Sequence, residues 1–348
     1  MRPGAVALLV ALAGPAAAQT APEDAARFGP ETGPGALVVR GTTDVALFAP
    51  LLDAFVASLP GIAVAYEQWG SNDLNAVTLA GCRGEGTPAD LVVSSAVDLQ
   101  VKLVNDGCAH PHSSLMTVAL PPSAAWRDEL FGVTEEPAVI VYNRDLVPPD
   151  EAPRSRFDLI DLLRPDDSRY AGRVATYDIE ESGLGYLFAF ADSQQATTFG
   201  SLIEAFARSR AIATCCSAEI IQGVAEGRYL IAYNVLGSYA LDRAQEDPRL
   251  AVVAPEDYTL VLSRAAMIPR GAPNPTGAGL LIDFMLSDEG RAALAAQHLL
   301  VEDGGHLLPD DDISLYRPIA LSPTLLLGLD QQKRETFLAR WRATFSQP

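Results

Sequence analysis

The sequence predicts an α/β protein built from two lobes, and three observations support this prediction. Short apolar runs with strand character alternate with segments of helical periodicity, which is typical of βα units. The chain has 348 residues, enough for about two domains. A second set of strands and helices follows the first at about residues 157–253, and a β segment then carries the chain back.

The first lobe is predicted at residues 36–136. Its strands are short apolar runs, and Pro60-Gly61 ends its first helix. Thr42-Thr43 and Ser94-Ser95 precede two of its helices, where hydroxyl residues are favoured as N-caps. In chain order we expect a strand at 36–39, a helix at 45–57, a strand at 62–66, a helix at 71–79, a strand at 89–93 and a helix after Ser95.

Residues 137–255 are predicted to form the second lobe, residues 256–305 to return to the first, and residues 306–348 to form a helical tail. In the second lobe we expect strands at 138–142, 173–177 and 229–233 and helices at 157–163, 185–192, 199–210 and 218–226. For the return segment and the tail we expect a long β segment at 258–268 and helices at 276–286, 288–296 and 333–345.

Residues 1–18 have the pattern of a secretory signal peptide. A basic start is followed by an apolar run at 5–13 and by small residues before Gln19. The alternative, a membrane anchor, is disfavoured because the apolar run is too short to cross a bilayer. We therefore expect a free, exported protein. Residues 19–35 are rich in Pro and Gly and are predicted to be a disordered mature N-terminus.

The strongly acidic composition excludes some partners. The formal net charge is -19, and it becomes -20 when Arg2 leaves with the signal peptide. Nucleic acids and anionic lipids are bound by clustered Lys and Arg, and the sequence contains no polybasic run. A small anionic ligand remains possible, because helix ends and single arginines set the local field inside a cleft.

Four cysteines fit an oxidising compartment. Cys82 and Cys108 lie in one segment and flank the strand-like run 90–94, so we expect them to pair. Cys215 and Cys216 are adjacent, and they either bond to each other or pair elsewhere. A metal role for the cysteines is disfavoured, because the four histidines and the cysteines show no CxxC or HxxxH spacing.

Three strand-to-helix junctions are rich in hydroxyl groups or glycine: Thr42-Thr43, Ser94-Ser95 and residues 182–185. At such junctions free backbone N–H groups and the positive end of the helix dipole face outward. A single junction of this kind is usually an ordinary helix cap. Three together favour an oxyanion site, because ligands of open α/β sheets bind at the carboxyl ends of the strands.

Several segments resemble one known family. They are Ala89 to Leu99, Val139 to Leu146, Ser182 to Tyr186, Ile268 to Pro275 and Phe284 to Gly290. In this order and spacing, over about residues 36–300, the chain is similar to the ferric-type branch of the periplasmic solute-binding proteins of ABC transporters. The resemblance implies a type II periplasmic binding protein fold with a hinge and an interlobe ligand cleft. It also implies hinge closure around the ligand and delivery to an inner-membrane permease.

The ligand class is predicted from one departure from this family. Its metal-binding members carry two adjacent tyrosines after a strand that corresponds to residues 230–234, and Gly237 and Ser238 stand at that place here. A ferric ion needs anionic oxygen ligands, for which Tyr239 and scattered carboxylates are a poor substitute. We therefore expect a small anionic solute: a phosphorylated sugar, a phosphoglycerate-like compound or an organic carboxylate. The alternatives are a ferric ion or ferric chelate, and a sensor that serves a membrane histidine kinase.

The predicted ligand site draws on both lobes. For Trp69 and Tyr258 the alternative is a position in the core of a lobe, because large aromatic side chains are mostly buried. Arg144 or Arg264 can supply a bidentate contact, and Glu180 and Glu181 can accept hydroxyl groups. The candidate ligand-binding residues are Thr42, Thr43, Trp69, Ser94, Ser95, Ser182, Gly183, Gly185, Asn234, Gly237, Ser238 and Tyr258.

An enzyme is not expected. The paired carboxylates, such as Glu135-Glu136, are sequence neighbours that point to opposite faces of an extended chain. Residues 182–185 lack the leading glycine of a nucleophile elbow and the lysine of a P-loop. We expect no cofactor, no resident metal and no oligomer, so the chain should act as a monomer.

Overall fold

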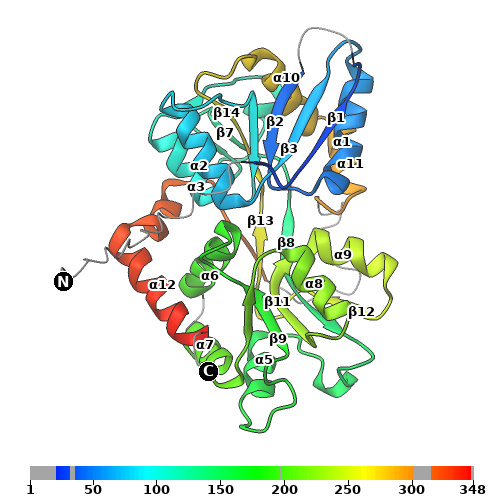
Figure 1. Cartoon of the computed structure of the whole chain (residues 1–348), viewed down its shortest axis with the longest axis vertical. Helices are drawn as coiled ribbons and strands as arrows, with labels where there is room; N and C mark the ends of the chain where they lie inside the picture. The colour runs from blue at the N-terminus through cyan, green and yellow to red at the C-terminus, as the bar shows by residue number, and fades with distance from the viewer. Residues whose placement is uncertain (1–20, 32–35, 196, 301–314, 346–348) are drawn as a thin grey trace, which may run out of the picture.

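The computed structural model describes residues 21–31, 36–195, 197–300 and 315–345, which form two lobes (Figure 1). The signal peptide predicted at residues 1–18 lies outside the described residues. Each lobe is centred on a mixed β-sheet with helices packed around it, as the alternation of strand and helix patterns predicted. None of the helices in these four ranges combines the length and apolar character needed to cross a membrane.

Lobe 1, the upper lobe in Figure 1, contains an eight-stranded sheet. Its strands are β1 (Asp24–Phe28), β2 (Leu37–Gly41), β3 (Val64–Gln68), β4 (Leu91–Ser94), β5 (Ala109–His110), β6 (Ala125–Trp126), β7 (Leu130–Gly132) and β14 (Ala265–Pro269). They run in the order β1-β3-β2-β4-β14-β7-β6, and β5 pairs with β14. The helices of this lobe are α1 (Val45–Ser58), α2 (Ser71–Cys82), α3 (Val97–Asn105), α4 (Leu115–Val118), α10 (Pro275–Leu286) and α11 (Asp288–Ala295).

Lobe 2 contains a seven-stranded sheet. Its strands are β8 (Glu136–Asn143), β9 (Val174–Tyr177), β10 (Ile212–Thr214), β11 (Ile231–Leu236), β12 (Leu250–Val253), β13 (Thr259–Leu262) and β15 (Tyr316–Pro318). They run in the order β10-β9-β11-β8-β13-β15, and β12 pairs with β8. The helical segments are η1 (Pro149–Glu151), α5 (Arg156–Leu163), α6 (Gly183–Gln195), α7 (Phe199–Ser209), α8 (Ser217–Ala225) and α9 (Gly237–Glu246).

Each lobe has its own apolar core. Phe48 of α1 and Val39 of β2 are fully buried in lobe 1, and Phe206 of α7 and Ile231 of β11 are buried in lobe 2. Burial of one such side chain contributes about 1.5–3 kcal/mol. A third cluster extends between the lobes, since it joins Val101 of α3 to residues of lobe 2.

Within the ranges that the structure describes, two crossings between strands connect the lobes. The chain passes from β7 to β8 through residues 133–135, and it returns from β13 to β14 through Ser263 and Arg264. The crossings are bonded to each other: the N–H of Val133 donates to the carbonyl of Arg264 at 2.8 Å, and the N–H of Arg264 donates to Oγ1 of Thr134 at 2.8 Å. The expected single β segment at 258–268 is therefore two strands, one in each sheet, with the crossing between them.

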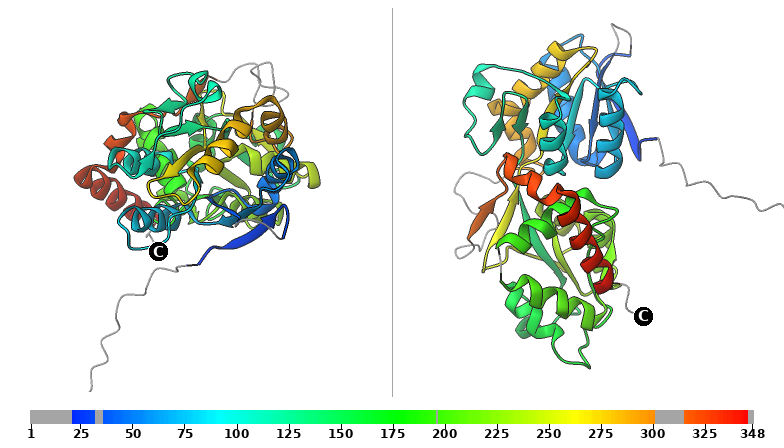
Figure 2. Two further views of the ribbon diagram at one scale, coloured as in Figure 1. Left: turned by 90° about the horizontal axis from the view of Figure 1, so that it is seen from above. Right: turned by 90° about the vertical axis from the view of Figure 1, so that its left-hand side faces the viewer.

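The C-terminal segment contacts both lobes. It consists of β15, the 3-10 helix η2 (Pro323–Leu329) and α12 (Gln331–Phe345). Helix η2 packs on α3 of lobe 1, and α12 packs on α7 of lobe 2. Figure 2 shows the segment beginning beside the junction of the lobes and running along lobe 2. The expected helix at 333–345 is present.

One local expectation is wrong. Residues 19–35 were expected to be disordered, but β1, in the part of this segment that the structure describes (21–31), pairs along its length with β3 in antiparallel register. The reason is that β3 offers an unpaired edge, and its hydrogen-bonding groups are satisfied when a further strand adds to it. This strand brings Glu23 to the space between the lobes. Residues 19–20 and 32–35 lie outside the described residues.

All four cysteines are in disulfides. Cys82 and Cys108 are bonded, with their Cα atoms 5.3 Å apart, as expected. Cys215 and Cys216 are bonded to each other, which decides between the two pairings left open by the sequence.

Candidate functional site

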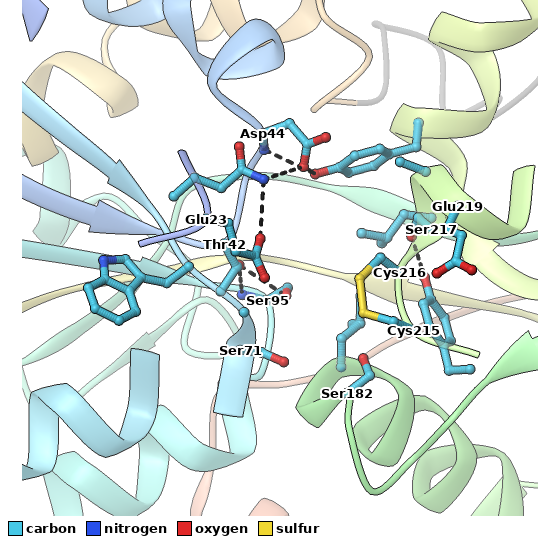
Figure 3. A pocket seen from close by; sticks show the side chains of 18 of the residues that line it. Glu23, Thr42, Asp44, Ser71, Ser95, Ser182, Cys215, Cys216, Ser217 and Glu219 are labelled. Atoms are coloured by element: carbon cyan, nitrogen blue, oxygen red, sulfur yellow. Dashed lines mark hydrogen bonds between the residues drawn. A yellow bond between two sulfur atoms is a disulfide. The ribbon is translucent and has the colours of Figure 1, made fainter. Parts of the chain in front are cut away.

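A cavity of about 300 Å³ lies between the two lobes (Figure 3). Its lining from lobe 1 and the crossing strand is Glu23, Thr42, Asp44, Gln68, Trp69, Gly70, Ser71, Ser95 and Arg264. Its lining from lobe 2 is Tyr177, Glu181, Ser182, Leu184, Cys215, Cys216, Ser217, Ala218, Glu219, Leu236 and Tyr239. A more open groove of about 650 Å³ lies at α6, α7 and α12, but it faces solvent and is not enclosed by the lobes. The interlobe cavity is therefore the candidate site.

Hydroxyl groups at the ends of β2 and β4 form one side of the cavity. Thr42 follows β2, and Ser95 follows β4. Oγ1 of Thr42 accepts from the N–H of Ser95 at 2.9 Å and from Nη1 of Arg264 at 3.2 Å, and it donates to Oγ of Ser95 at 3.1 Å. Parallel strands bring these two ends to one edge of the sheet, so the residues meet although 53 positions separate them.

Two helix N-termini from opposite lobes line the same cavity. Helix α2 begins at Ser71 after Gly70, and α8 begins at Ser217 after Cys216. No side chain of the described residues makes a capping hydrogen bond at either N-cap. Backbone N–H groups in the first turn of a helix have no partner within the helix, and the helix dipole adds positive potential. Both ends can therefore donate hydrogen bonds to ligand oxygens.

Arg264 is the only cation among the described residues that line the cavity. Its side chain is 1% exposed, and its Nε lies 2.8 Å from Oε1 of Glu136. Burial alone lowers the pKa of Arg264, but the charge and hydrogen bond of Glu136, together with the nearby phenols of Tyr239 and Tyr66, hold the pKa above its usual value. The guanidinium is thus charged, and a buried carboxylate already neutralises it.

Four carboxylates also line the cavity: Glu23, Asp44, Glu181 and Glu219. They come from separate elements, and Figure 3 shows three of them spread around the rim. Among the described residues no group of three or more His, Cys, Asp or Glu is placed to hold a metal ion. The carboxylates are instead suited to accept hydrogen bonds from hydroxyl or ammonium groups.

The lobes touch each other around the cavity. The hydroxyl of Tyr239 donates to Oδ1 of Asp44 at 2.8 Å. Oγ of Ser71 accepts from the N–H of Gly183 at 2.9 Å, and Nδ2 of Asn72 donates to the carbonyls of Glu180 and Glu181 at 2.9 and 2.8 Å. These bonds join elements of lobe 1 to elements of lobe 2, so the structure represents a closed arrangement of the cleft.

Four of the candidate ligand-binding residues line the cavity: Thr42, Trp69, Ser95 and Ser182. Trp69 is only 5% exposed and packs in a small core of lobe 1, so little of its ring is accessible to a ligand. Gly183 lies beside the cavity, where its N–H forms an interlobe bond. Of the two arginines considered, Arg264 lines the cavity and Arg144 is exposed elsewhere.

The other candidates lie outside the cavity lining, for identifiable structural reasons. Thr43 is fully buried, and Oγ of Ser94 caps the N–H of Ala96. Gly185 is a close-packing position, because a Cβ there would collide with the side chain of Tyr177. Asn234 has a φ of 65° at an irregularity in β11, a conformation that Asn tolerates better than most residues.

The last three candidates outside the lining pack on, or hydrogen-bond to, other residues of lobe 2. A Cβ at Gly237 would meet Cγ of Pro137 at 2.6 Å, so this glycine permits a close approach to β8. The hydroxyl of Ser238 donates to Glu136, and the hydroxyl of Tyr258 donates to Asp192 at 2.6 Å. Their polar groups are therefore used within the protein.

Sequence reasoning missed much of the lobe 2 side. The strand β10 is short and half-buried, so it lacked an apolar run, and the junction from β10 to α8 was not recognised. The signal that was available is Ser217, which follows the cysteine pair directly before an apolar helical pattern. Glu23 was missed because its segment was expected to be disordered.

Comparison with known proteins identifies the family. The model of the bacterial extracellular solute-binding protein family matches residues 86–305. The chain belongs to this family. A substrate-binding protein of an ABC transporter from Agrobacterium tumefaciens is 34% identical to this solute-binding protein, with a TM-score of 0.86, and the match covers 92% of this chain and 98% of the other. No curated protein matches the chain significantly.

More distant structures share the fold of this solute-binding protein. AfuA from Actinobacillus pleuropneumoniae, solved with fructose 6-phosphate, is 17% identical with a TM-score of 0.67, over 90% of this chain and 99% of AfuA. Iron-bound HitA from Pseudomonas aeruginosa is 19% identical with a TM-score of 0.61, over 76% of this chain and 85% of HitA. The predicted two-lobed fold is confirmed, and the family consists of binding proteins rather than enzymes.

Proposed function

We propose that this protein is the periplasmic receptor of an ABC transporter for a small, hydroxylated organic anion. A sugar phosphate is the best fit, and phosphoglycerate-like compounds and hydroxycarboxylates belong to the same class. The observation that carries the proposal is that the uncapped N-termini of α2 and α8, one from each lobe, line the same cavity. An oxyanion placed between them accepts hydrogen bonds from both lobes and stabilises the closed state.

The rest of the lining supports the hydroxylated character of the ligand. Sugar hydroxyls donate as well as accept, so the carboxylates of Glu181 and Glu219 are suitable acceptors for them. A phosphate or carboxylate would be repelled by the same groups and is expected at the backbone N–H groups of the helix ends and near Thr42 and Ser95. The carboxylate of Glu219, in the first turn of α8, accepts from the hydroxyl of Thr214 at 3.1 Å. The cavity volume of about 300 Å³ suits a molecule of this size.

A ferric ion is the alternative, because Tyr177 and Tyr239 line the cavity. Both hydroxyls are engaged, with Ser217 and with Asp44. Burial raises the pKa of each phenol above its ordinary value, which disfavours the phenolate that a ferric ion requires. These groups support the organic anion over the metal. The two-lobed form would equally serve a sensor for a histidine kinase, which differs only in the protein that receives it.

The test is a thermal-shift screen of the mature protein against fructose 6-phosphate, glucose 6-phosphate, 3-phosphoglycerate, citrate and ferric chloride. A compound present at 100 times its Kd should add about 2.7 kcal/mol of stability, which is a shift of a few degrees for a protein of this size. A shift with ferric chloride alone contradicts the proposal.

A pair of variants tests the helix N-terminus. Ala218→Pro removes one N–H from the first turn of α8, where proline is tolerated and no intrahelical bond is lost. Ala218→Ser keeps this N–H and serves as the control. We expect the proline variant to bind the active compound at least tenfold more weakly by calorimetry and the serine variant to bind within threefold of the wild type.

A further inference from the structure

The wall of the cleft contains a disulfide between adjacent residues. Cys215 follows β10 and Cys216 is the N-cap of α8, so the bond lies at the junction from strand to helix. Both cysteines line the cavity, together with Ser217, Ala218 and Glu219, which follow them. Figure 3 shows the disulfide on the lobe 2 side, across the cavity from Ser71 and Ser95 of lobe 1.

The disulfide belongs to the apolar part of the lining. Leu184 and Leu236 line the same side of the cavity, beside the hydroxyl groups of Ser182 and Ser217. The sulfur atoms of a disulfide are polarizable and lack a hydrogen-bond donor, so they favour contact with carbon over contact with an oxyanion. A ligand whose polar groups bond to lobe 1 and to the helix ends would therefore turn its carbon skeleton toward Cys215 and Cys216.

The bond also restrains the backbone that leads into α8. Two adjacent residues joined through their sulfurs form a small ring, which removes most of the torsional freedom of the peptide between them. That peptide immediately precedes the first turn of α8, whose N–H groups line the cavity. Preorganised donors bind more tightly, because less conformational entropy is lost on binding.

We propose that the Cys215–Cys216 disulfide is a ligand-contacting element of the cleft, which packs on the carbon skeleton of the solute and holds the first turn of α8 in its binding orientation. This inference rests on the proposed function of the cleft as an anion receptor. It implies that affinity depends on the oxidised form. A dithiol that reduces the bond transfers two electrons and two protons, gives two cysteine thiols and is itself oxidised to a disulfide.

The second disulfide provides a matched control. Cys82 is the last residue of α2, and Cys108 precedes β5, so this bond lies within lobe 1 and outside the cavity lining. Its removal affects the stability of lobe 1 without changing any group that faces the ligand. Removal of either bond leaves two serines in place of two cysteines, and the side-chain chemistry of the two double variants is the same.

The first experiment measures binding of fructose 6-phosphate and of citrate by calorimetry to the wild type, to Cys215→Ser/Cys216→Ser and to Cys82→Ser/Cys108→Ser. Circular dichroism checks that each variant is folded at the assay temperature. For the probe that binds the wild type, we expect a Kd at least tenfold higher for the first variant and within threefold for the second. Equal affinity of the wild type and Cys215→Ser/Cys216→Ser overturns the inference alone. A wild type that binds neither these two probes nor glucose 6-phosphate or 3-phosphoglycerate overturns the proposed function and the inference with it.

The second experiment tests contact directly in the unmodified protein. The wild type is treated with dithiothreitol with and without the saturating probe, and each pair of thiols is alkylated and quantified by mass spectrometry. A bound ligand that covers the bond should slow reduction of Cys215–Cys216 at least tenfold and leave the rate for Cys82–Cys108 unchanged. Equal rates for Cys215–Cys216 with and without the probe overturn the proposed contact, even if the double variant binds weakly.

Discussion

Arg264 and Glu136 form a buried ion pair at the place where the two lobes are joined, with Nε and Oε1 2.8 Å apart. Glu136 begins β8 just after one crossing, and Arg264 lies within the other. Glu136 also accepts from the hydroxyls of Thr134 and Ser238, and Arg264 donates to Thr42 of the cleft. The pair therefore connects the hinge to the lining of the candidate site.

Removal of one member of this pair should be strongly destabilising. Glu136→Gln leaves the guanidinium of Arg264 buried without a counter-charge, and loss of one partner of a buried pair typically costs about 3–5 kcal/mol. Urea unfolding at pH 7 measures this loss. The matched control is Glu180→Gln, which breaks an exposed ion pair with Arg342 and should cost less than about 1 kcal/mol. Similar losses in the two variants would show that the buried ion pair of Glu136 contributes no more to stability than an exposed one.

The contact between Tyr239 and Asp44 should favour the closed cleft. Tyr239→Phe removes the hydroxyl that donates to Oδ1 of Asp44 and accepts from its N–H at 3.1 Å, while the ring remains. Because these bonds cross between the lobes, their loss should shift the ligand-free protein toward open forms by about 1–2 kcal/mol. Small-angle scattering should then report a larger radius of gyration. Tyr229→Phe, which changes a tyrosine outside the cavity, should leave the radius unchanged.

Asp98 should make stability depend on pH. It lies on α3, is 2% exposed, and burial raises its pKa to about 7 despite the nearby charge of Arg334. An acid with a raised pKa in the folded state binds its proton more tightly there than in the unfolded chain. The tighter proton binding of Asp98 therefore adds to the free energy of unfolding. This contribution is complete below about pH 4 and is lost as the pH rises through about 7.

The variant Asp98→Asn tests this dependence, since an amide does not titrate. Between pH 5 and pH 8, the free energy of unfolding of the wild type should fall relative to that of the variant. The expected difference is at most about 2.7 kcal/mol, because only the two pH units from 5 to 7 of the shift of about 3 pK units fall in this range. Urea titrations at the two pH values measure it. Parallel pH profiles for the two proteins would exclude a raised pKa at Asp98.

The Cys82–Cys108 disulfide should stabilise lobe 1. It closes a loop across a sequence separation of 26, for which the chain-entropy estimate is about 3.5 kcal/mol. Guanidinium unfolding of Cys82→Ser/Cys108→Ser should show a loss of this order. Reduction of the wild type with dithiothreitol should reproduce this loss. An unchanged midpoint of guanidinium unfolding, both in the double variant and in the reduced wild type, would mean that the bond does not constrain the unfolded chain.

Local patterns were sufficient for the regular elements that carry an apolar face. The helices over 45–57, 199–210 and 276–286 were expected within one or two residues of α1, α7 and α10, because their apolar residues recur at helical spacing. Helix α9 was missed, since its first residues, Gly237 and Ser238, were interpreted only as ligand-binding groups. Strands β6 and β7 are too short to show any alternation.

The candidate site was predictable only in part. A rule about strand ends places Thr42 and Ser95 at one edge of the lobe 1 sheet, and it places Ser182 after β9 in the lobe 2 sheet. Tyr258, by contrast, donates to Asp192 in lobe 2, and nothing in the sequence near either residue indicates that they meet across 66 positions. Whether a hydroxyl faces the cleft or the core depends on the packing of the whole lobe.

The sequence by itself determined the two-lobed α/β class, the family and the hydroxyl-rich strand ends, because these depend on local periodicity and on short motifs. Only the tertiary structure decided that Arg264 is neutralised by Glu136, that four separate parts of the chain, Glu23 among them, place carboxylates in one cavity, and that Cys215 and Cys216 form part of its wall. The physical reason is that charge pairing, burial and cavity lining are set by contacts between distant segments. Such contacts arise only when both sheets and the strands that cross between them have formed.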